Sequence, residues 1–495
     1  METSMSDETS DIVELVTIVP DGDIILDVTF ETSKKTLKAA RAARAARKVT
    51  KGKPNPDASL PPLKPTLRVQ YRVYSSVLRE VSKYFRALLG FDSYAEGKTI
   101  ETAFKELSLQ GTNPSEAATK DLPHIAIHVD DKESQSANQQ VVFEDIMDIL
   151  HGIALPSAPV TMHFLATMGV LADRFDCLEP VMKGFKSELK FKSFKWPATQ
   201  TRLSRYEDGE VLTAEAEGVL RQKIYVAWLF NQPLKFEKST AELILYGSRR
   251  WSALGEDDET DSSYTAPWWQ LPDNIETELQ ERRTCILNTI ASIPQHFLKL
   301  YTSRDRQCKL GYDSSSSCDS YQLGETIKFL VKHNLFSLVD FSPSSLQRIP
   351  DFATVEINYI LGLLKQFPGY QIDKNHTNCG LRTRIRPILD VVASLLSSRS
   401  VSLSRTLWAS DRQLATWTSS AGEGGIETVS LVTPPTSTAM RVRAVHNPFK
   451  IVKTFEFTRS IASEQQLRHA GALGSDGLAR AMFTANEWDW TPQGS

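Results

Sequence analysis

Residues 73–90, VYSSVLREVSKYFRALLG, decide how the first half of this 495-residue chain is interpreted. Their apolar side chains recur at helical spacing and define one face, whereas the charged side chains fall elsewhere. Ser82 interrupts this face at a point where a second helix could begin, because serine is a good N-cap residue. We therefore predict either one amphipathic helix or two short helices that meet at Ser82, with the apolar face packed against the rest of a domain.

Strand and helix patterns surround this stretch. Residues rich in β-branched and aromatic side chains, typical of strands, lie at 23–31, 67–74 and 124–131. Helical patterns follow at 141–152, 160–177 and 178–189. Gly152 is placed to end the first of these helices. The insert 32–66, which separates the first two strands, is Ala-rich and basic and then Pro-rich, and it is too long for an ordinary hairpin loop. This order predicts an α+β domain.

The second half of the chain is mostly helical by pattern. Helices are predicted at 214–230, 239–246, 275–301, 321–334, 352–367 and 385–398. Pro294 is expected to end or kink the longest one. We therefore divide the chain into a flexible tail 1–20, an α+β domain 21–195, a helical domain 196–398, a Ser/Thr/Gly/Pro-rich linker 399–448 and a C-terminal segment 449–495. Within the last segment, EWDWTP at 487–492 could be a docking peptide or could pack onto the helical domain.

Net charge and cysteine content indicate the cellular compartment of the protein and the partners it lacks. The net charge of −3 predicts no global attraction to nucleic acid or to an acidic membrane. The five cysteines are odd in number, widely spaced and without a CxxC pair, which favours a reducing compartment. The first residues are polar and acidic, and no apolar run approaches the roughly 20 residues that cross a bilayer. We expect a protein of the cytoplasm or the nucleus, with no membrane partner.

The first domain resembles the BTB/POZ domain. The resemblance depends on the order of DVTF at 27–30, YSSVLREVSKYFRALL at 74–89, the strand 125–129, FEDIMDILHG at 143–152 and the paired helices of 160–189. The family usually has His followed by a basic residue where this chain has Tyr74 and Ser75. The chain is also similar to large BTB-containing proteins of filamentous fungi, including in GLRTRIRPILD at 380–390.

This resemblance implies a protein–protein interaction module or scaffold that forms homo-oligomers, because dimers of the family bury an apolar surface contributed by helices and the first strand. It implies that one set of residues maintains the domain: Asp27, Val77, Leu78, Ser82, Phe85, Leu88 and Gly152. An alternative function is a substrate adaptor of a cullin-type ubiquitin ligase. Tyr94-Ala95-Glu96 fits the hydrophobic-x-Glu pattern with which some BTB adaptors contact a cullin, so Tyr94 and Glu96 are the candidate contacts.

The basic insert suggests a second alternative, a nuclear regulator. Residues 34–53 hold nine Lys or Arg and no acid. Arg41, Arg44 and Arg47 recur every third residue, so a helix would display them as a basic stripe and, with Lys48, they would form a localisation signal. The competing interpretation is a solvated, partly helical loop. We favour that interpretation and predict no nucleic-acid partner, because no aromatic residue is interleaved for base stacking.

No pattern predicts catalysis. The Gly-rich stretch 471–479 lacks the Gly-x-Ser-x-Gly spacing of a nucleophile elbow. The Gly-rich stretch 421–427 lacks the Lys-Ser/Thr pair of a phosphate-binding loop. We therefore predict a protein that is not an enzyme and has no catalytic residues.

Four residues are candidates for a metal site. His376 and Cys379 have a spacing that metal sites sometimes use, and Cys308 and Cys318 could supply further ligands. A structural zinc site normally shows two compact ligand pairs, and the second pair is missing here. We therefore predict buried thiols and a surface histidine, with no metal and no cofactor.

Overall fold

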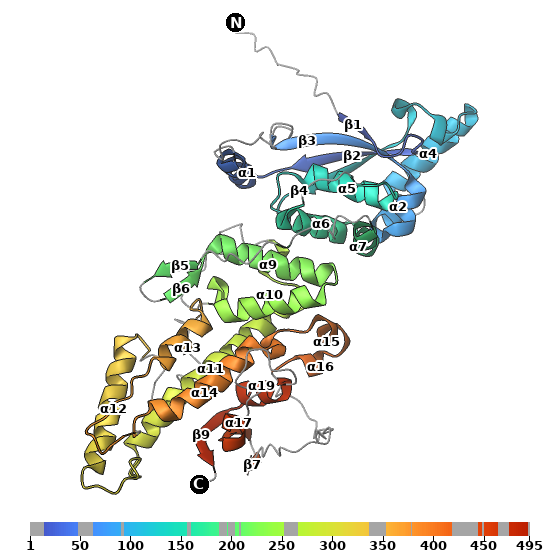
Figure 1. Cartoon of the computed structure of the whole chain (residues 1–495). Helices are drawn as coiled ribbons and strands as arrows, with labels where there is room; N and C mark the ends of the chain where they lie inside the picture. The colour runs from blue at the N-terminus through green and yellow to red at the C-terminus, as the bar shows by residue number, and fades with distance from the viewer. Residues whose placement is uncertain are drawn as a thin grey trace. The chain divides into compact units, whose positions relative to one another are not determined.

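The computed structural model describes residues 14–47, 63–90, 94–155, 160–187, 196, 203–206, 209–251, 266–335, 353–377, 379–417, 444–447, 450–463 and 475–493. The chain divides into two compact units. Unit 1 comprises Met1–Thr199 and Glu259–Gln270, and unit 2 comprises Gln200–Asp258 and Leu271–Ser495. Helices predominate and strands are few, so the expected α+β class is confirmed at this coarse level (Figure 1).

Unit 1 is built on a four-stranded sheet of order β1-β3-β2-β4. Its strands are β1 (Glu14–Thr17), β2 (Ile24–Glu31), β3 (Thr66–Val73) and β4 (His124–Asp130). β2 and β3 are antiparallel, whereas β1 runs parallel to β3 and β4 parallel to β2. Three strands were predicted. The fourth, β1, corrects the prediction of a loose tail over 1–20, since a four-residue strand carries too little pattern to be read from sequence.

Five helices of unit 1 lie along one face of the sheet (Figure 1): α2 (Ser75–Val81), α3 (Lys83–Leu88), α5 (Gln139–Leu150), α6 (Met162–Arg174) and α7 (Leu178–Ser187). Phenylalanine rings join them to the sheet. Phe143 packs edge-to-face against Phe30 at 5.8 Å and against Phe175 at 5.4 Å between ring centroids. Phe85 stacks on Phe175 at 5.5 Å. Each buried ring removes a large apolar area from water, so this cluster is the centre of the unit.

The stretch 73–90 forms two helices rather than one. α2 ends and α3 begins at Ser82, whose extended backbone (φ −133°, ψ 129°) interrupts the helix. Its hydroxyl oxygen accepts the Phe85 N–H at 3.0 Å and donates to the Phe175 carbonyl at 2.6 Å. The predicted N-cap is thereby confirmed, and it also joins α3 to the end of α6. Leu78 and Phe85 are fully buried, whereas Val77 and Leu88 are half-buried.

Gly152 lies where it was predicted, just beyond the end of α5. It has φ +71°, a conformation that glycine adopts without steric cost. Its N–H donates to the Ile149 carbonyl at 3.1 Å, and the N–H of Ile153 donates to the Asp148 carbonyl at 2.8 Å. This pair of bonds is a Schellman motif, which satisfies the last carbonyls of the helix.

The other face of the sheet is covered in part by a helix that the sequence analysis missed. α4 (Ala95–Leu109) lies in the polar region 92–121, where no element was predicted. Side chains of a strand alternate between the two faces, so Ile25 points away from the phenylalanine cluster. It forms a separate apolar cluster with α4 and the loop after it: Leu107, Ala117, Leu122 and the partly buried Phe104.

The first half of the basic insert is α1 (Lys34–Arg47). Leu37 is its buried anchor, and the Ser33 hydroxyl donates to Asp131 at 2.9 Å. Arg41 donates to the Leu63 carbonyl and Arg44 to the Asn138 side chain, each at 3.4 Å. The first half of the insert is thus helical and mostly exposed, in agreement with the interpretation of a solvated, partly helical loop, and Leu37 anchors it to the domain. The side chain of Arg47 and all of Lys48 lie outside the described residues, so the localisation signal stays a prediction.

Unit 1 also includes a segment from much later in the chain. Trp268, in the 3-10 turn η5 (Pro267–Trp269), is 2% exposed. Its ring meets that of His163 on α6 edge-to-face, with centroids 5.9 Å apart. Along the sequence, Gln200–Asp258 of unit 2 therefore fall between two segments of unit 1.

Unit 2 is centred on α11 (Ile275–Thr302) (Figure 1). α9 (Ala214–Leu229) packs against α10 (Pro233–Tyr246). Three helices pack against α11: α10, α12 (Ser315–Lys332) and α19 (Asp476–Phe483). α13 (Ile357–Lys365) packs against α14 (Arg382–Ser397). Pro294 lies inside α11, which continues to Thr302, so of the two expected outcomes, an end or a kink, the helix does not end there. The remaining elements here are β5 (Leu203–Tyr206) and β6 (Gly209–Leu212).

The predicted linker begins too early. Its first residues form η9 (Arg399–Val401), α15 (Arg405–Ser410) and α16 (Arg412–Ala415), because Trp408 and Trp417 are buried against the helices. Residues 418–443 lie outside the described part.

The C-terminal segment forms a small sheet of order β7-β8-β9. Its elements are β7 (Ala444–Asn447), β8 (Lys450–Thr458), α17 (Arg459–Ser463) and β9 (Glu487–Gln493). Trp490 is fully buried and donates its indole N–H to the Ser292 hydroxyl of α11 at 2.9 Å. Of the two interpretations of EWDWTP, packing onto its own unit is therefore the one observed.

Candidate functional site

Asp27 is the charged residue at the centre of the sheet of unit 1. It lies on the face opposite the phenylalanine cluster, because Asp27 and Phe30 differ in parity along β2. Arg68 of β3 donates to its carboxylate from Nε at 2.7 Å, and Gln70 donates at 3.4 Å. Hydrogen bonding by Arg68 outweighs burial and holds the pKa of Asp27 below its usual value. The sequence analysis named Asp27 but missed Arg68, whose approach depends on the strand register Thr29↔Arg68.

His151 shows how the region around Tyr74 and Ser75 is organised. Its Nε2 accepts the Tyr74 N–H at 3.2 Å and its Nδ1 lies 2.8 Å from the Met147 carbonyl. Burial lowers the pKa of His151, so the ring is a neutral structural partner. The Ser75 hydroxyl donates to Asp23 at 2.7 Å. Because both ring nitrogens of His151 are engaged by the backbone, this Ser–Asp–His neighbourhood does not present the Ser–His contact of nucleophilic catalysis.

Tyr84, Tyr94 and Glu96 form an aromatic and acidic surface, here called the Tyr–Glu patch. Tyr84 on α3 is 37% exposed and Tyr94, just before α4, is 55% exposed. Partial burial raises the pKa of Tyr84, and the Glu96 carboxylate acts in the same direction. Glu96 lies in the first turn of α4, where a negative charge is favoured by the helix dipole. Of the two residues of the hydrophobic-x-Glu pattern, Tyr94 is exposed and Glu96 is half-buried, and Tyr84 was not singled out from the sequence.

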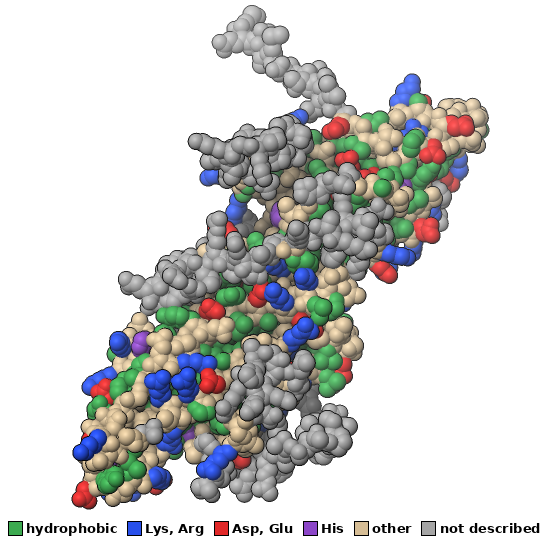
Figure 2. Space-filling view, viewed as in Figure 1, with side chains coloured by type: hydrophobic (Ala, Val, Ile, Leu, Met, Phe, Trp, Pro, Cys, Tyr) green, Lys and Arg blue, Asp and Glu red, His purple; other side chains and the backbone are tan. Residues whose placement is uncertain are grey.

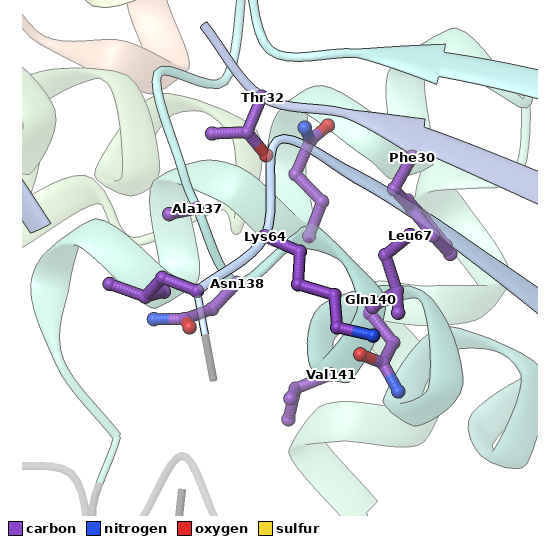
Figure 3. Close-up of a pocket in the computed structure, with 10 residues that line it drawn as sticks. Phe30, Thr32, Lys64, Leu67, Ala137, Asn138, Gln140 and Val141 are labelled. Carbon is purple, nitrogen blue, oxygen red and sulfur yellow. The ribbon is translucent and has the colours of Figure 1, made fainter. Parts of the chain in front are cut away.

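A shallow pocket lies where the basic insert rejoins the sheet (Figure 3). Phe30, Lys64, Leu67, Asn138 and Gln140 contribute to its walls. Its volume is about 30 Å³, space for little more than water, whereas small-molecule sites usually occupy hundreds of Å³. The visible face of the molecule shows acidic and basic side chains interspersed with apolar ones rather than one continuous field (Figure 2).

Buried ion pairs hold unit 2 together. Arg221 is fully buried and donates to the carboxylate of Glu217 on its own helix at 2.9 Å and to that of Glu276 of α11 at 2.7 Å. The Ser248 hydroxyl joins them, accepting from Arg221 at 2.7 Å and donating to Glu217 at 2.5 Å. On α11 itself, Arg282 pairs with Glu278 at 2.6 Å and donates to the carbonyl of Ser402. Since each charge is compensated, we assign this network to the packing of the helices.

Three thiols of unit 2 converge. The sulfur atoms of Cys308, Cys318 and Cys379 all lie within 4.8 Å of one another, and those of Cys308 and Cys379 are 3.8 Å apart. Burial raises the pKa of Cys308, but hydrogen bonds with Ser315, the Leu310 backbone and the two other cysteines outweigh it, and the pKa is lowered. His376 lies beside them and is 0% exposed, which corrects the prediction of a surface histidine. The structure therefore brings together the three cysteines, with His376 beside Cys308, although the sequence predicts no metal site at these residues.

Comparison of the chain with protein-family models, with curated proteins and with solved structures gave no match. Among the described residues, no helix combines the length and apolar character needed to span a membrane.

Proposed function

We propose that the protein is a protein–protein interaction module that self-associates through unit 1, which resembles a BTB/POZ domain. The order and packing of unit 1 support this proposal. A β2–β3 hairpin is followed by the helix pair α2–α3 joined at Ser82, then by the parallel strand β4 and by α5, α6 and α7. This is the order of elements on which the resemblance depends, and Ser82 and Phe85, which it names as residues that maintain the domain, are both buried.

The first strand offers a surface for association. β1 is an edge strand of the sheet, and an edge strand presents unpaired backbone groups that another chain can bind. Leu15 of β1 is 43% exposed. The resemblance implies a dimer surface that includes the strand predicted at 23–31, which is β2. β1 belongs to the same sheet, and an exposed leucine on an edge strand suits association with another chain.

Light scattering of the full-length chain at micromolar concentration tests the proposal. We expect a dimer, and we expect Leu15→Arg to shift the equilibrium towards monomer, because the new charge would have to be desolvated in the interface. Leu234→Arg is the matched control, since Leu234 on α10 is also exposed, at 62%, but lies in unit 2. A wild-type chain that remains monomeric throughout would refute self-association.

A cullin adaptor is the second candidate, favoured by the exposure of the Tyr–Glu patch. Pull-down with a cullin would retain the wild-type chain, and Glu96→Ala would reduce the retained amount. Glu101→Ala is the control, because Glu101 lies on the same helix but is paired with Lys105 at 2.6 Å. Equal retention of the two variants would remove this alternative.

A further inference from the structure

The spacing of the three sulfur atoms is that of a metal-binding site. A tetrahedral centre with Zn–S bonds of about 2.3 Å separates its ligand sulfurs by about 3.8 Å. Cys308 and Cys379 show a separation of 3.8 Å, and no pair in the cluster exceeds 4.8 Å. A disulfide would need an S–S distance of about 2.05 Å and would leave the third thiol without a role. The geometry thus suits three ligands of one ion.

His376 supplies a fourth ligand of the right type. Its side chain is fully buried beside Cys308, and its Nε2 lies 3.4 Å from the Ser314 hydroxyl at the start of α12. The Nδ1 atom lies 2.9 Å from a carboxylate oxygen of Asp373. Donation of Nδ1–H to that oxygen leaves a lone pair on Nε2, and a carboxylate in this position is the usual partner of a metal-binding histidine. Asp373 therefore acts as a positioning residue for the ring.

The backbone around the cluster is fixed by its neighbours. The carboxylate of Asp319 accepts the N–H groups of Gln307 and Cys308, each at 2.9 Å. The Tyr301 hydroxyl donates to the Cys379 carbonyl at 3.3 Å. A Cβ atom at Gly380 would lie 3.1 Å from the Tyr370 carbonyl, so the chain passes through a narrow space directly after Cys379. These contacts hold the ligands in place without contributing ligand atoms.

We propose that Cys308, Cys318, Cys379 and His376 bind one Zn²⁺ ion tetrahedrally, and that this ion fastens together the loop after α11, the start of α12 and the loop before α14. Three thiolates and one imidazole select zinc over the hard cations Mg²⁺ and Ca²⁺. Four protein ligands leave no open position for water or substrate, so the ion has a structural role. The site was hidden in the sequence because Cys308 and Cys318 are ten residues apart instead of forming a compact pair.

Metal analysis of the purified full-length chain tests the proposal. We expect one zinc ion per chain in the wild type and in Cys285→Ser, and a loss of bound zinc in Cys318→Ser. Cys285 is the matched control because it is a free cysteine of unit 2 that does not belong to the cluster. Exchange with Co²⁺ should give the intense visible and thiolate charge-transfer absorption of a tetrahedral site. Asp373→Asn should weaken binding by about 10- to 100-fold in competition with a chelator.

Two results from the wild-type chain would overturn the proposal, and neither depends on the folding of a variant. One is a wild-type chain that, after purification with zinc present, contains no stoichiometric metal and gives no tetrahedral Co²⁺ spectrum. The other is mass-spectrometric detection of a disulfide between Cys308 and Cys379 in the wild type prepared under reducing conditions. Full zinc content in a folded Cys318→Ser variant would likewise exclude this ligand set.

Discussion

Replacement of Ser82 by alanine removes two hydrogen bonds from the core of unit 1. The hydroxyl caps α3 by accepting the Phe85 N–H, and loss of such a cap costs roughly 0.5–2 kcal/mol. The same hydroxyl donates to the Phe175 carbonyl, and Ser82 is 1% exposed, so water does not replace the lost donor. An unsatisfied buried acceptor adds about 1–3 kcal/mol. We therefore expect Ser82→Ala to lower the free energy of unfolding of unit 1 by about 2–4 kcal/mol, a large share of a typical domain's stability.

Hydrogen exchange of the full-length chain measures this change within unit 1. The slowest amides of β2 and β3 exchange only when the sheet opens, so they report the unfolding free energy of the unit. The expected loss corresponds to exchange that is roughly 30- to 900-fold faster. Thr161→Ala is the matched control, because Thr161 caps α6 through the same type of bond at 3.1 Å but is exposed. It should cost about 1 kcal/mol or less. Equal effects of the two variants would refute the double role of the Ser82 hydroxyl.

Three further predictions concern the buried ion pairs of unit 2, the buried histidines of unit 1 and the proposed zinc site. Arg221→Ala should destabilise unit 2 by about 3–5 kcal/mol, because it leaves the buried Glu217 carboxylate unpaired; urea unfolding compared with the exposed control Arg250→Ala checks this, and a loss similar to the control would contradict it. Burial lowers the pKa of His151 and of His163, so unit 1 should have its full stability above about pH 6.5 and lose stability as the pH falls, since the unfolded chain takes up protons first. Exchange of the β2 and β3 amides at about pH 7 and about pH 5, corrected for intrinsic rates, measures the change, and a flat profile would contradict it. Removal of zinc by a chelator should accelerate exchange in α12 and in the loop that carries Cys308, but not in β2 or β3; no change in α12 would count against a structural ion.

The parts of the fold that were predicted carry strong local pattern. β2 and β3 are dominated by β-branched and aromatic residues, and Ser82 stands at an interruption of a helical face, so both were placed from sequence. α4 was missed because its apolar residues are few and diluted by polar ones, and its stability comes from contacts such as Leu107 with Ile25. β1 is fixed by its pairing with β3, which no local pattern reveals.

The candidate sites were harder to predict because they depend on register and on long-range contacts. Arg68 reaches Asp27 only because β2 and β3 pair in one particular register. Likewise, Cys379 reaches Cys308 across 71 residues of chain through the packing around α11 and α12. Residue types at these positions were visible in the sequence, but a ligand set that folding assembles from three segments has no compact spacing to recognise. Asp373 carried a weak signal, three residues before His376.

The late return of Trp268 to the side of His163 has a consequence for biosynthesis. A ribosome releases every strand of the first sheet well before residue 268, and α9 and α10 emerge in the interval. Unit 1 therefore cannot complete its core until Trp268 has been synthesised, and this happens only after residues 200–258 of unit 2 have been translated. A fragment cut after residue 199 would leave the ring of His163 uncovered, and genetic dissection of this protein has to keep residues 259–270 with the first unit.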